Sequence, residues 1–184
     1  MNNVDDDHHF SASAALRDGT PVTIRVMRPD DKERLAAAFG KLDSMSVYTR
    51  FFSFRKELPE RSLERLAAID FVRLAGLVAT VGARDEETII GSATYVAVES
   101  ADAVPTAEVA FTIEEDVQGQ GLAGRLLGAL TTIARRHGIQ RFTAEVLADN
   151  AAMLAVFARS GLPMRRRRDA GVLHIELDLG ADPT

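Results

Sequence analysis

Hydrophobic and polar positions along the chain repeat with two different periods, and their order predicts a succession of strands and helices. Residues 20–27 alternate between apolar and polar side chains, which is typical of a strand with one buried face. Asp30, with Glu33 three residues later, then predicts the start of a helix whose apolar side carries Leu35 and Phe39. Strand-like runs follow at residues 74–83, 88–98 and 107–113, and an antiparallel meander is their simplest arrangement.

Two further helix starts, at Ser44 and Pro59, fall between the first helix and the meander. The helix that begins near Ser44 would carry Tyr48, Phe51 and Phe52 on one side, a spacing that is typical of a helix facing the core. We therefore expect a second helical element in two pieces.

The C-terminal half alternates between helices and strands. A helical stripe covers residues 122–137, Gly138 is suited to end that helix, and a strand-like run follows at residues 141–147. A strand, a helix and a strand in this order predict one parallel crossover unit. Asn150 is a good N-cap for a last helix, and two strands are expected at residues 163–168 and 172–179. The fold class is thus α/β, with a mixed, mostly antiparallel sheet of about seven strands.

Composition limits the classes of protein to which the chain can belong. Its 184 residues fit one domain, and 46% hydrophobic with 27% charged residues is typical of globular proteins. We expect an acidic, disordered tail over residues 1–13 and a single domain over residues 14–184. The absence of cysteine excludes disulfides, thiolate metal sites and a cysteine nucleophile. The net charge of −5, and apolar runs too short for a membrane span, indicate a cytoplasmic protein that binds neither nucleic acid nor membranes.

A glycine-rich segment between a strand and the long helix carries the most specific signal. Glycines let backbone amides approach a ligand closely, and the start of a helix presents unpaired N–H groups with a partial positive charge. Together they form a site for an anion, most naturally a phosphate. The residues of this segment are Gln118, Gly119, Gln120, Gly121, Leu122, Ala123, Gly124 and Arg125.

Three other interpretations compete for this segment. The first is a tight turn that only allows close helix packing. The second, a Walker loop, lacks the required lysine and hydroxyl, since Arg125 and Leu126 occupy their places. The third, a dinucleotide fingerprint, matches G-x-G-x-x-G literally and has Glu145 about 20 residues further on. Against it, five residues separate the strand from the first glycine, and too few strands follow.

The pattern Gln118-x-x-Gly121-x-Ala123 resembles the coenzyme A signature Q/R-x-x-G-x-G/A of the GNAT superfamily of N-acetyltransferases. Residues 150–162 are similar to the second motif of that family, which begins with an asparagine and ends in Gly-Phe or Gly-Leu. The predicted order of elements also looks like the GNAT fold. The resemblance implies acetyl-CoA as co-substrate, held by residues 118–125 and by a strand that splays from its neighbour. The further coenzyme-binding residues that it implies are Phe111, Thr112, Ile113, Asn150 and Phe157.

A narrower resemblance covers residues 42–52, followed by Glu57 and Leu58. This stretch is similar to the acceptor-side helix of bacterial protein lysine acetyltransferases of the Pat type, whose targets include acyl-CoA synthetases. The chain matches only the acetyltransferase domain of such enzymes, which usually carry an extra regulatory or synthetase-like domain. The resemblance implies a protein lysine, such as one on an acyl-CoA synthetase, as the acceptor.

Acetyl transfer to a lysine needs a neutral amine, and deprotonation at pH 7 costs about 4.6 kcal/mol because the unperturbed pKa is about 10.4. Glu108 occupies the place of the general base in many GNAT enzymes, and strand alternation puts it on one face with Ala110 and Thr112. Glu145, at a similar level of the next strand, is the second candidate base. A surface glutamate without a catalytic role is the alternative for Glu108.

The remaining residues complete the expected chemistry. Backbone amides near residues 111–113 are the available oxyanion donors. Phe157 stands where many relatives have a tyrosine that protonates the leaving thiolate, so water is expected to do so here. Arg165, Arg166, Arg167 and Arg168 are expected in a solvated hairpin, and no histidines have the spacing of metal ligands.

The sequence therefore predicts direct transfer of an acetyl group from acetyl-CoA to a primary amine, with a protein lysine as the expected acceptor and no metal. Two alternatives stay open: a small-amine acetyltransferase acting on a polyamine, amino acid or antibiotic, and a module that binds acyl-CoA without transfer. We expect a monomer or a homodimer.

Overall fold

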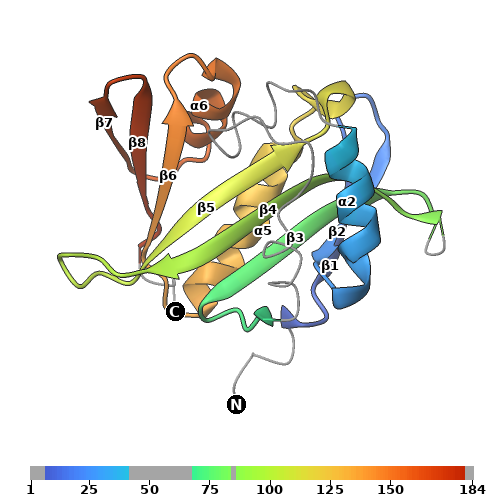
Figure 1. Ribbon diagram of the computed structural model, residues 1–184, viewed down its shortest axis with the longest axis horizontal. Coiled ribbons are helices and arrows are strands. Elements are labelled where there is room, and N and C mark those ends of the chain that lie inside the picture. The colour runs from blue at the N-terminus through green and yellow to red at the C-terminus, as the bar shows by residue number, and fades with distance from the viewer. Residues whose placement is uncertain (1–6, 42–67, 84–85, 181–184) are drawn as a thin grey trace.

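The computed structural model describes residues 7–41, 68–83 and 86–180, and over these residues the chain forms one mixed sheet with helices on both faces (Figure 1). The strands are β1 (Ser11–Ala15), β2 (Pro21–Val26), β3 (Leu74–Val81), β4 (Thr88–Val98), β5 (Thr106–Ile113), β6 (Arg141–Leu147), β7 (Met164–Asp169) and β8 (Val172–Asp178). The helices are α2 (Lys32–Gly40), α5 (Leu122–Arg136) and α6 (Ala151–Ala158), with 3₁₀ turns η1 (Pro29–Asp31) and η4 (Glu115–Val117).

The strand order is β1-β2-β3-β4-β5-β6-β8-β7, and only β5 and β6 are parallel neighbours. The predicted meander is confirmed for β3 to β5, and the predicted parallel crossover is confirmed for β5, α5 and β6. The described residues contain eight strands, one more than predicted, because β1 extends the sheet at one edge.

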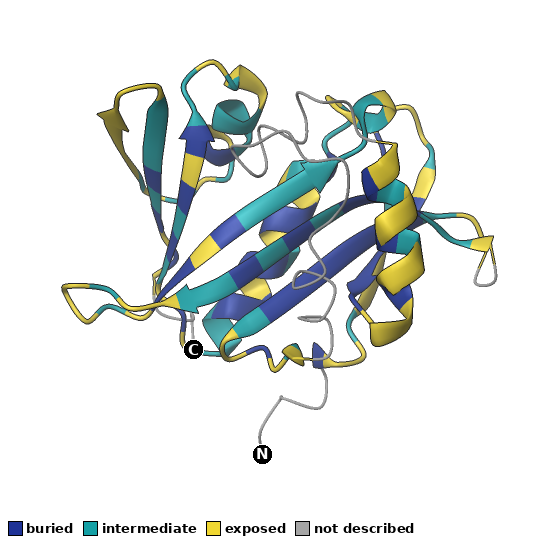
Figure 2. Ribbon diagram, viewed as in Figure 1, coloured by how far each residue is buried: buried dark blue, intermediate teal, exposed yellow. Residues whose placement is uncertain are grey.

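Two hydrophobic clusters hold the layers together. In Figure 1, α5 passes behind the strands and α2 lies in front of them. Alternating side chains of β3 supply both clusters: Leu77 belongs to the larger one, with Leu126 and Leu130 of α5, and Val78 to a smaller one, with Leu35 of α2. The edge strand β7 is almost entirely exposed, as Figure 2 shows. The main core therefore lies between the sheet and α5.

The N-terminal residues 7–13 are not the disordered tail that the sequence predicts. Residues 11–13 belong to β1, which pairs with β2. Asp7 is fully buried, and its two carboxylate oxygens lie 2.8 Å from Arg136 Nη1, in the last turn of α5, and 2.8 Å from Nε2 of His137, the residue that follows the helix. The run Ser-Ala-Ser-Ala-Ala contains only small side chains and no β-branched or aromatic residue, so the pattern does not reveal this edge strand. Residues 1–6 lie outside the described residues.

The start of α2 is anchored by a buried ion pair. Asp31, not the predicted Asp30, precedes the helix, and its carboxylate accepts hydrogen bonds from Arg25 at 2.7 and 2.8 Å and from the Arg28 N–H at 2.8 Å. Burial alone would raise the pKa of Asp31, but these hydrogen bonds outweigh it and hold the pKa below its usual value. Arg25 also donates to Glu87 at 2.7 Å. The group ties α2 to β2 and to the turn before β4.

The other predicted elements agree with the structure to within a few residues. The predicted helix at 122–137 is α5, the strand at 141–147 is β6, and Asn150 caps α6. Several predictions lie outside the described residues: the helix starts at Ser44 and Pro59, the aromatic residues Tyr48, Phe51 and Phe52, and Glu57 with Leu58.

Candidate active site

Strands β5 and β6 are joined over a short stretch and then separate. Their parallel register covers three residue pairs, and Glu108 with Thr143 is the last of them. β4 stays paired with β5 as far as Ile113, so the gap opens only on the β6 side. Figure 1 shows the two strands starting together and diverging toward η4 and α6. The expected splay is present, and Glu108 lies at its narrow end.

The backbone of β5 presents hydrogen-bonding groups to this gap. The Glu114 N–H donates to Ile90 O at 3.0 Å. The backbone N–H and C=O groups of the even-numbered residues of β5 therefore point toward β4. By strand alternation, the N–H and C=O groups of Phe111 and Ile113 point toward the gap, beyond the last residue paired with β6. Gln118 Nε2 donates to Ile113 O at 3.3 Å. The gap therefore offers the Phe111 and Ile113 N–H groups as donors to a ligand or an oxyanion.

The glycine-rich segment forms the turn between η4 and α5. Gly119 and Gly121 have φ angles of 74° and 87°, a region that favours glycine, and Gly121 is the N-cap of α5. The Arg125 N–H donates to Gly121 O at 3.3 Å and closes the first turn of the helix. The N–H groups that precede it in the helix have no intrahelical acceptor, and they belong to Leu122, Ala123 and Gly124. This end of α5 has the geometry of an anion site.

Side chains of the same segment divide between the core and solvent. Leu122 is 1% exposed, so only its backbone can meet a ligand. A Cβ placed on Gly119 or Gly124 would meet no atom within 4 Å, so the loop borders open space. Arg125 is exposed, while Gln120 is half-buried.

Thr112 of β5, a further predicted coenzyme-binding residue, pairs with Ser92 of β4, so its backbone groups point away from the gap.

Arg17, in the turn between β1 and β2, holds the glycine-rich segment from outside. Its Nη1 donates to Gly119 O at 2.9 Å, and its backbone N–H donates to Gln120 O at 3.3 Å. Because the C=O and N–H of a trans peptide point in opposite directions, fixing the Gln120 carbonyl turns the Gly121 N–H away from Arg17. No motif in the sequence points to Arg17, since 102 residues separate it from Gly119.

Asn150 and Phe157 place α6 beside the gap. Asn150 Oδ1 accepts a hydrogen bond from the Met153 N–H at 3.1 Å, so its carboxamide oxygen is engaged in capping. Phe157 is 1% exposed and contacts Phe111 edge to face, with ring centroids 6.1 Å apart. Phe157 thus contributes an apolar wall, and its ring has no proton to donate.

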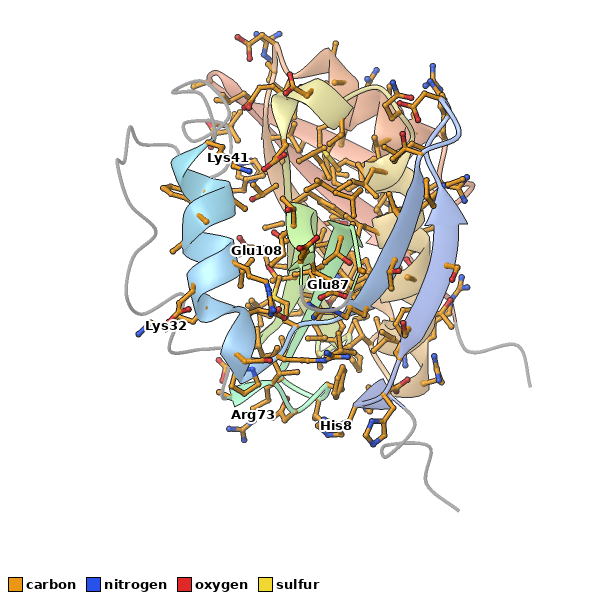
Figure 3. All side chains as sticks on the ribbon, turned by 90° about the vertical axis from the view of Figure 1, so that its right-hand side faces the viewer. His8, Lys32, Lys41, Arg73, Glu87 and Glu108 are labelled. Carbon is orange, nitrogen blue, oxygen red and sulfur yellow. The ribbon has the colours of Figure 1, made fainter. Side chains whose placement is uncertain are left out.

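Glu108 and Glu145 lie on the same face of the sheet. Ala107 and Val109 are buried with the α5 side chains, which leaves Glu108 exposed on the opposite face, as strand alternation predicts. Figure 3 views the sheet from one edge and labels Glu108 on the side where α2 lies. Glu145 is also exposed, and its Oε1 lies 3.3 Å from His174 Nδ1.

A cavity of about 410 Å³ brings these two carboxylates together. The residues that line it come from β5, β6, β8 and β7, and they are Glu108, Thr143, Ala144, Glu145, Arg165, Arg166, Arg167, His174, Ile175 and Glu176. The arginines are exposed on the edge strand, as the prediction of a solvated hairpin requires. That prediction missed their position, because three of the four line the same cavity as the candidate bases.

Glu114, directly after β5, is a titratable residue that sequence patterns do not single out. Its Oε1 is buried and has no hydrogen-bond partner among the described residues. Burial raises the pKa of Glu114, Lys41 opposes this rise, and the charges of Glu115 and Asp116 add to it. Only the three-dimensional burial of the side chain reveals this acid beside the glycine-rich segment.

Two further features are absent from the part of the chain that the structure describes, a metal-binding cluster and a membrane-spanning helix. No group of three or more histidines, aspartates or glutamates there is arranged to hold a metal ion. None of the helices in that part is long and apolar enough to cross a membrane. The groups that line the site are backbone N–H groups, carboxylates and guanidinium groups.

Comparison with known proteins identifies the family. The sequence profile of the Acetyltransferase (GNAT) family matches residues 42–162, which is more than half of the chain, and the chain belongs to this family. The predictions of a GNAT fold and of membership in an acetyltransferase family are confirmed.

Two relatives have different lengths. The chain is 38% identical over 165 residues to the acetyltransferase Pat of Mycolicibacterium smegmatis, a match that covers 89% of this chain and 47% of that protein. It is 31% identical over 178 residues to the acetyltransferase PA5475 of Pseudomonas aeruginosa, with 92% and 94% covered. The chain thus spans about half the length of the first relative and most of the second.

Solved structures agree with this assignment. The GNAT domain of S. lividans PAT superposes with a TM-score of 0.81 at 35% identity, over 91% of this chain and 96% of that chain. The structure of yncA from Salmonella typhimurium, with its cofactor acetyl-CoA, shares the fold at a TM-score of 0.69 and 19% identity, over 89% and 96% of the two chains. The predicted resemblance to Pat-type enzymes is therefore confirmed.

Proposed function

We propose that this chain transfers the acetyl group of acetyl-CoA directly to the side-chain amine of a protein lysine, with Glu108 as the general base. The observation that supports this most is the position of Glu108 at the narrow end of the gap between β5 and β6, on an exposed face of the sheet. A thioester held along β5 would meet there an amine that arrives from solvent. The 38% identity to the acetyltransferase Pat supports a lysine acceptor, and an acyl-CoA synthetase is the first protein to test.

The coenzyme binds, in this proposal, to backbone groups more than to side chains. Its pyrophosphate accepts hydrogen bonds from the N–H groups at the start of α5, where Gly121 allows close approach. Its pantetheine arm lies in the gap beside Phe111 and Ile113, whose N–H groups point that way. Phe157, which contacts Phe111, forms the apolar wall of the gap.

The transfer needs one proton acceptor and no covalent enzyme intermediate. Glu108 takes a proton from the lysine ammonium, directly or through water, and the amine nitrogen attacks the thioester carbon. The oxyanion that forms accepts hydrogen bonds from the β5 N–H groups. The C–N bond is then complete and the C–S bond breaks as the nitrogen loses its second proton to water. Coenzyme A leaves as a thiolate, and water protonates it because Phe157 is no donor.

Glu145 is the second candidate for the base. Its carboxylate lies 3.3 Å from His174, whereas Glu108 has no ion pair within the described residues. The histidine contact occupies one side of the Glu145 carboxylate, whereas the Glu108 carboxylate has no such neighbour among the described residues to displace before an amine approaches. The proposal therefore assigns Glu108 to proton transfer.

The test is turnover with acetyl-CoA and a panel of proteins and small amines, followed by intact mass and by release of free thiol. We expect one or more acetyl groups on protein lysines. Acetyl-CoA at a hundredfold excess over its dissociation constant should stabilise the fold by about 2.7 kcal/mol, and NADH should not. Turnover of small amines alone would favour the small-amine alternative, and binding without any turnover would favour an acyl-CoA sensor.

A further inference from the structure

Charged and polar residues on the open face of the sheet form two rows across β5, β6, β8 and β7. Residues opposite one another in paired strands share a face, so the register defines these rows. The first row is Glu108, Thr143, Glu176 and Arg165, and the second is Glu145, His174 and Arg167. Both rows run from a carboxylate near the gap to an arginine at the sheet edge, and all seven residues are among those that line the cavity.

The two arginines at the end of these rows are available to a ligand. Arg165 and Arg167 are exposed, and the structure records no hydrogen bond or ion pair for either within the described residues. Arg168, on the same strand, donates from Nε to Ala170 O at 3.2 Å and lies on the opposite face, paired with Leu173. Arg168 does not line the cavity. Glu176 lies opposite Arg165 and His174 lies opposite Arg167, but neither guanidinium group forms a recorded ion pair within the described residues. Both therefore have hydrogen-bond donors available on the face that carries the candidate base.

We propose that this cavity selects lysines that lie in an acidic segment of the acceptor protein. The lysine amine meets Glu108, and aspartate or glutamate side chains beside that lysine pair with Arg165 and Arg167. This inference rests on the proposed function and adds the class of sequence that the enzyme prefers. Guanidinium groups are suited to this task because they stay charged and bind carboxylates with two hydrogen bonds.

The dimensions fit a short peptide. Neighbouring strands lie about 4.8 Å apart, so β7 is about 14 Å from β5 across the sheet. An extended peptide covers that span in about four residues, since each residue rises about 3.3 Å. The long arginine side chains shorten the distance further. Carboxylates within about four residues of the lysine are therefore in reach.

The mixed charge of the cavity argues against other ligands. Glu108, Glu145 and Glu176 would repel the phosphates of a nucleic acid or of an anionic membrane. Arg165 and Arg167 would repel the second amine of a polyamine. A lysine with nearby carboxylates carries both charges in the order that the rows present.

The experiment compares synthetic peptides that differ only beside one lysine. The neighbouring positions carry aspartate, asparagine or lysine, and kcat/KM is measured by release of free thiol from acetyl-CoA. We expect the wild-type enzyme to favour aspartate over asparagine by about threefold to tenfold, and to use the lysine-rich peptide least. The preference should shrink at about 1 M salt, where the Debye length falls to about 3 Å.

Matched variants locate the preference on the protein. Arg165→Glu with Arg167→Glu should abolish or invert it, whereas Arg168→Glu, the same charge change on the other face of β7, should leave it unchanged. Thermal unfolding and acetyl-CoA affinity should be those of the wild type in all variants. Should the double variant fail to fold, Arg165→Gln and Arg167→Gln singly are expected to halve the preference or more.

Two results would overturn the inference while leaving the proposed function intact. One is equal kcat/KM for the aspartate and asparagine peptides with the wild-type enzyme. The other is faster acetylation of free lysine than of any peptide, which would mean that the arginines bind the carboxylate of a single amino acid. If the enzyme binds acetyl-CoA but acetylates no lysine in any form, the proposed function fails and the inference falls with it.

Discussion

Arg17 Nη1 donates a hydrogen bond to the carbonyl oxygen of Gly119 at 2.9 Å, across the turn that leads into α5. Its backbone N–H also donates to Gln120 O, at 3.3 Å. The hairpin of β1 and β2, at the edge of the sheet, therefore supports the loop at which we propose the coenzyme pyrophosphate binds. Arg17 contacts no reacting atom in this arrangement, but it fixes the direction of the backbone N–H groups that would bind the anion.

Removal of this support should loosen the loop. We expect Arg17→Ala to weaken acetyl-CoA binding by about threefold to tenfold, since one hydrogen bond contributes about 0.5–1.5 kcal/mol. The melting temperature should change little because Arg17 is exposed. Isothermal titration calorimetry measures the affinity. The control is Asp18→Ala, which removes the hydrogen bond to the Thr20 N–H at 2.8 Å in the same turn but does not touch the loop. Equal losses for both variants would contradict a specific role of Arg17.

A side chain at Gly121 should block the approach of the pyrophosphate. Gly121→Val places a β-branched residue at a φ of 87°, so we expect about 1–2 kcal/mol of destabilisation together with at least a tenfold loss of acetyl-CoA affinity. Gly138→Val provides a matched control, because Gly138 has a φ of 78° and lies after the other end of α5. Gly138→Val should destabilise the fold to a similar extent but should bind acetyl-CoA with the wild-type affinity. An unchanged affinity for Gly121→Val would mean that the segment is only a turn.

The pH dependence of turnover should identify the base. Glu108→Gln keeps size and hydrogen bonding but removes basicity, so kcat/KM should fall by about 10² to 10⁴ near neutral pH. The loss should shrink as the pH rises toward the amine pKa of about 10.4, where solvent deprotonates the lysine. Glu145→Gln, on the neighbouring strand, should retain most of the wild-type activity. The reverse result would exchange the two roles, and full activity in both variants would leave positioning of the amine as the main contribution.

The buried ion pair at the start of α2 should make the free energy of unfolding fall as the solution becomes acidic. Because the pKa of Asp31 is lowered in the folded state, its stabilising effect is present above the unfolded pKa of about 3.9 and is lost as the pH falls through the folded pKa. We expect Asp31→Asn to destabilise the fold by about 3 kcal/mol at pH 7, and the difference from wild type to vanish at the lowest pH. Urea unfolding at several pH values measures this. The exposed neighbour provides the control, and Asp30→Asn should change stability by less than about 0.5 kcal/mol.

Glu114 should affect the pH dependence of stability in the opposite direction to Asp31. Its pKa is raised in the folded state, so its contribution is favourable below the unfolded pKa and is lost as the pH rises through the folded value. Glu114→Gln should therefore raise the free energy of unfolding at pH 7 and have no effect below about pH 4. Glu99→Gln, at an exposed site, should be neutral at both pH values. A gain that persists unchanged at low pH would exclude ionisation as the cause.

Local patterns predicted the parts of the site that depend on neighbours in sequence. Gly121 begins α5 and Asn150 caps α6 as expected, because a glycine turn and an N-cap act within a few residues. Strand alternation also placed Glu108 on the open face correctly. These features need no knowledge of distant parts of the chain.

The features that the sequence did not reveal depend on long-range pairing. Arg165 and Arg167 face Glu108 only because β8 inserts between β6 and β7, and no local pattern encodes that order or its register. Arg17 reaches the glycine-rich segment from a distant hairpin. Asp7 is buried against the end of α5, although its polar surroundings in the sequence resemble a solvated terminus.

The three-pair junction of β5 and β6 divides the sheet into a meander and a C-terminal unit of β6, β8 and β7. Fewer residue pairs join these two units than join any other neighbouring strands. The free protein should therefore open in two cooperative steps, with the C-terminal unit exchanging its amide hydrogens through a lower-energy partial unfolding. A ligand that binds in the gap would contact both units and stabilise their association. Binding of the coenzyme would then make the two units unfold as one, so the protection of the C-terminal unit against hydrogen exchange should rise with coenzyme occupancy.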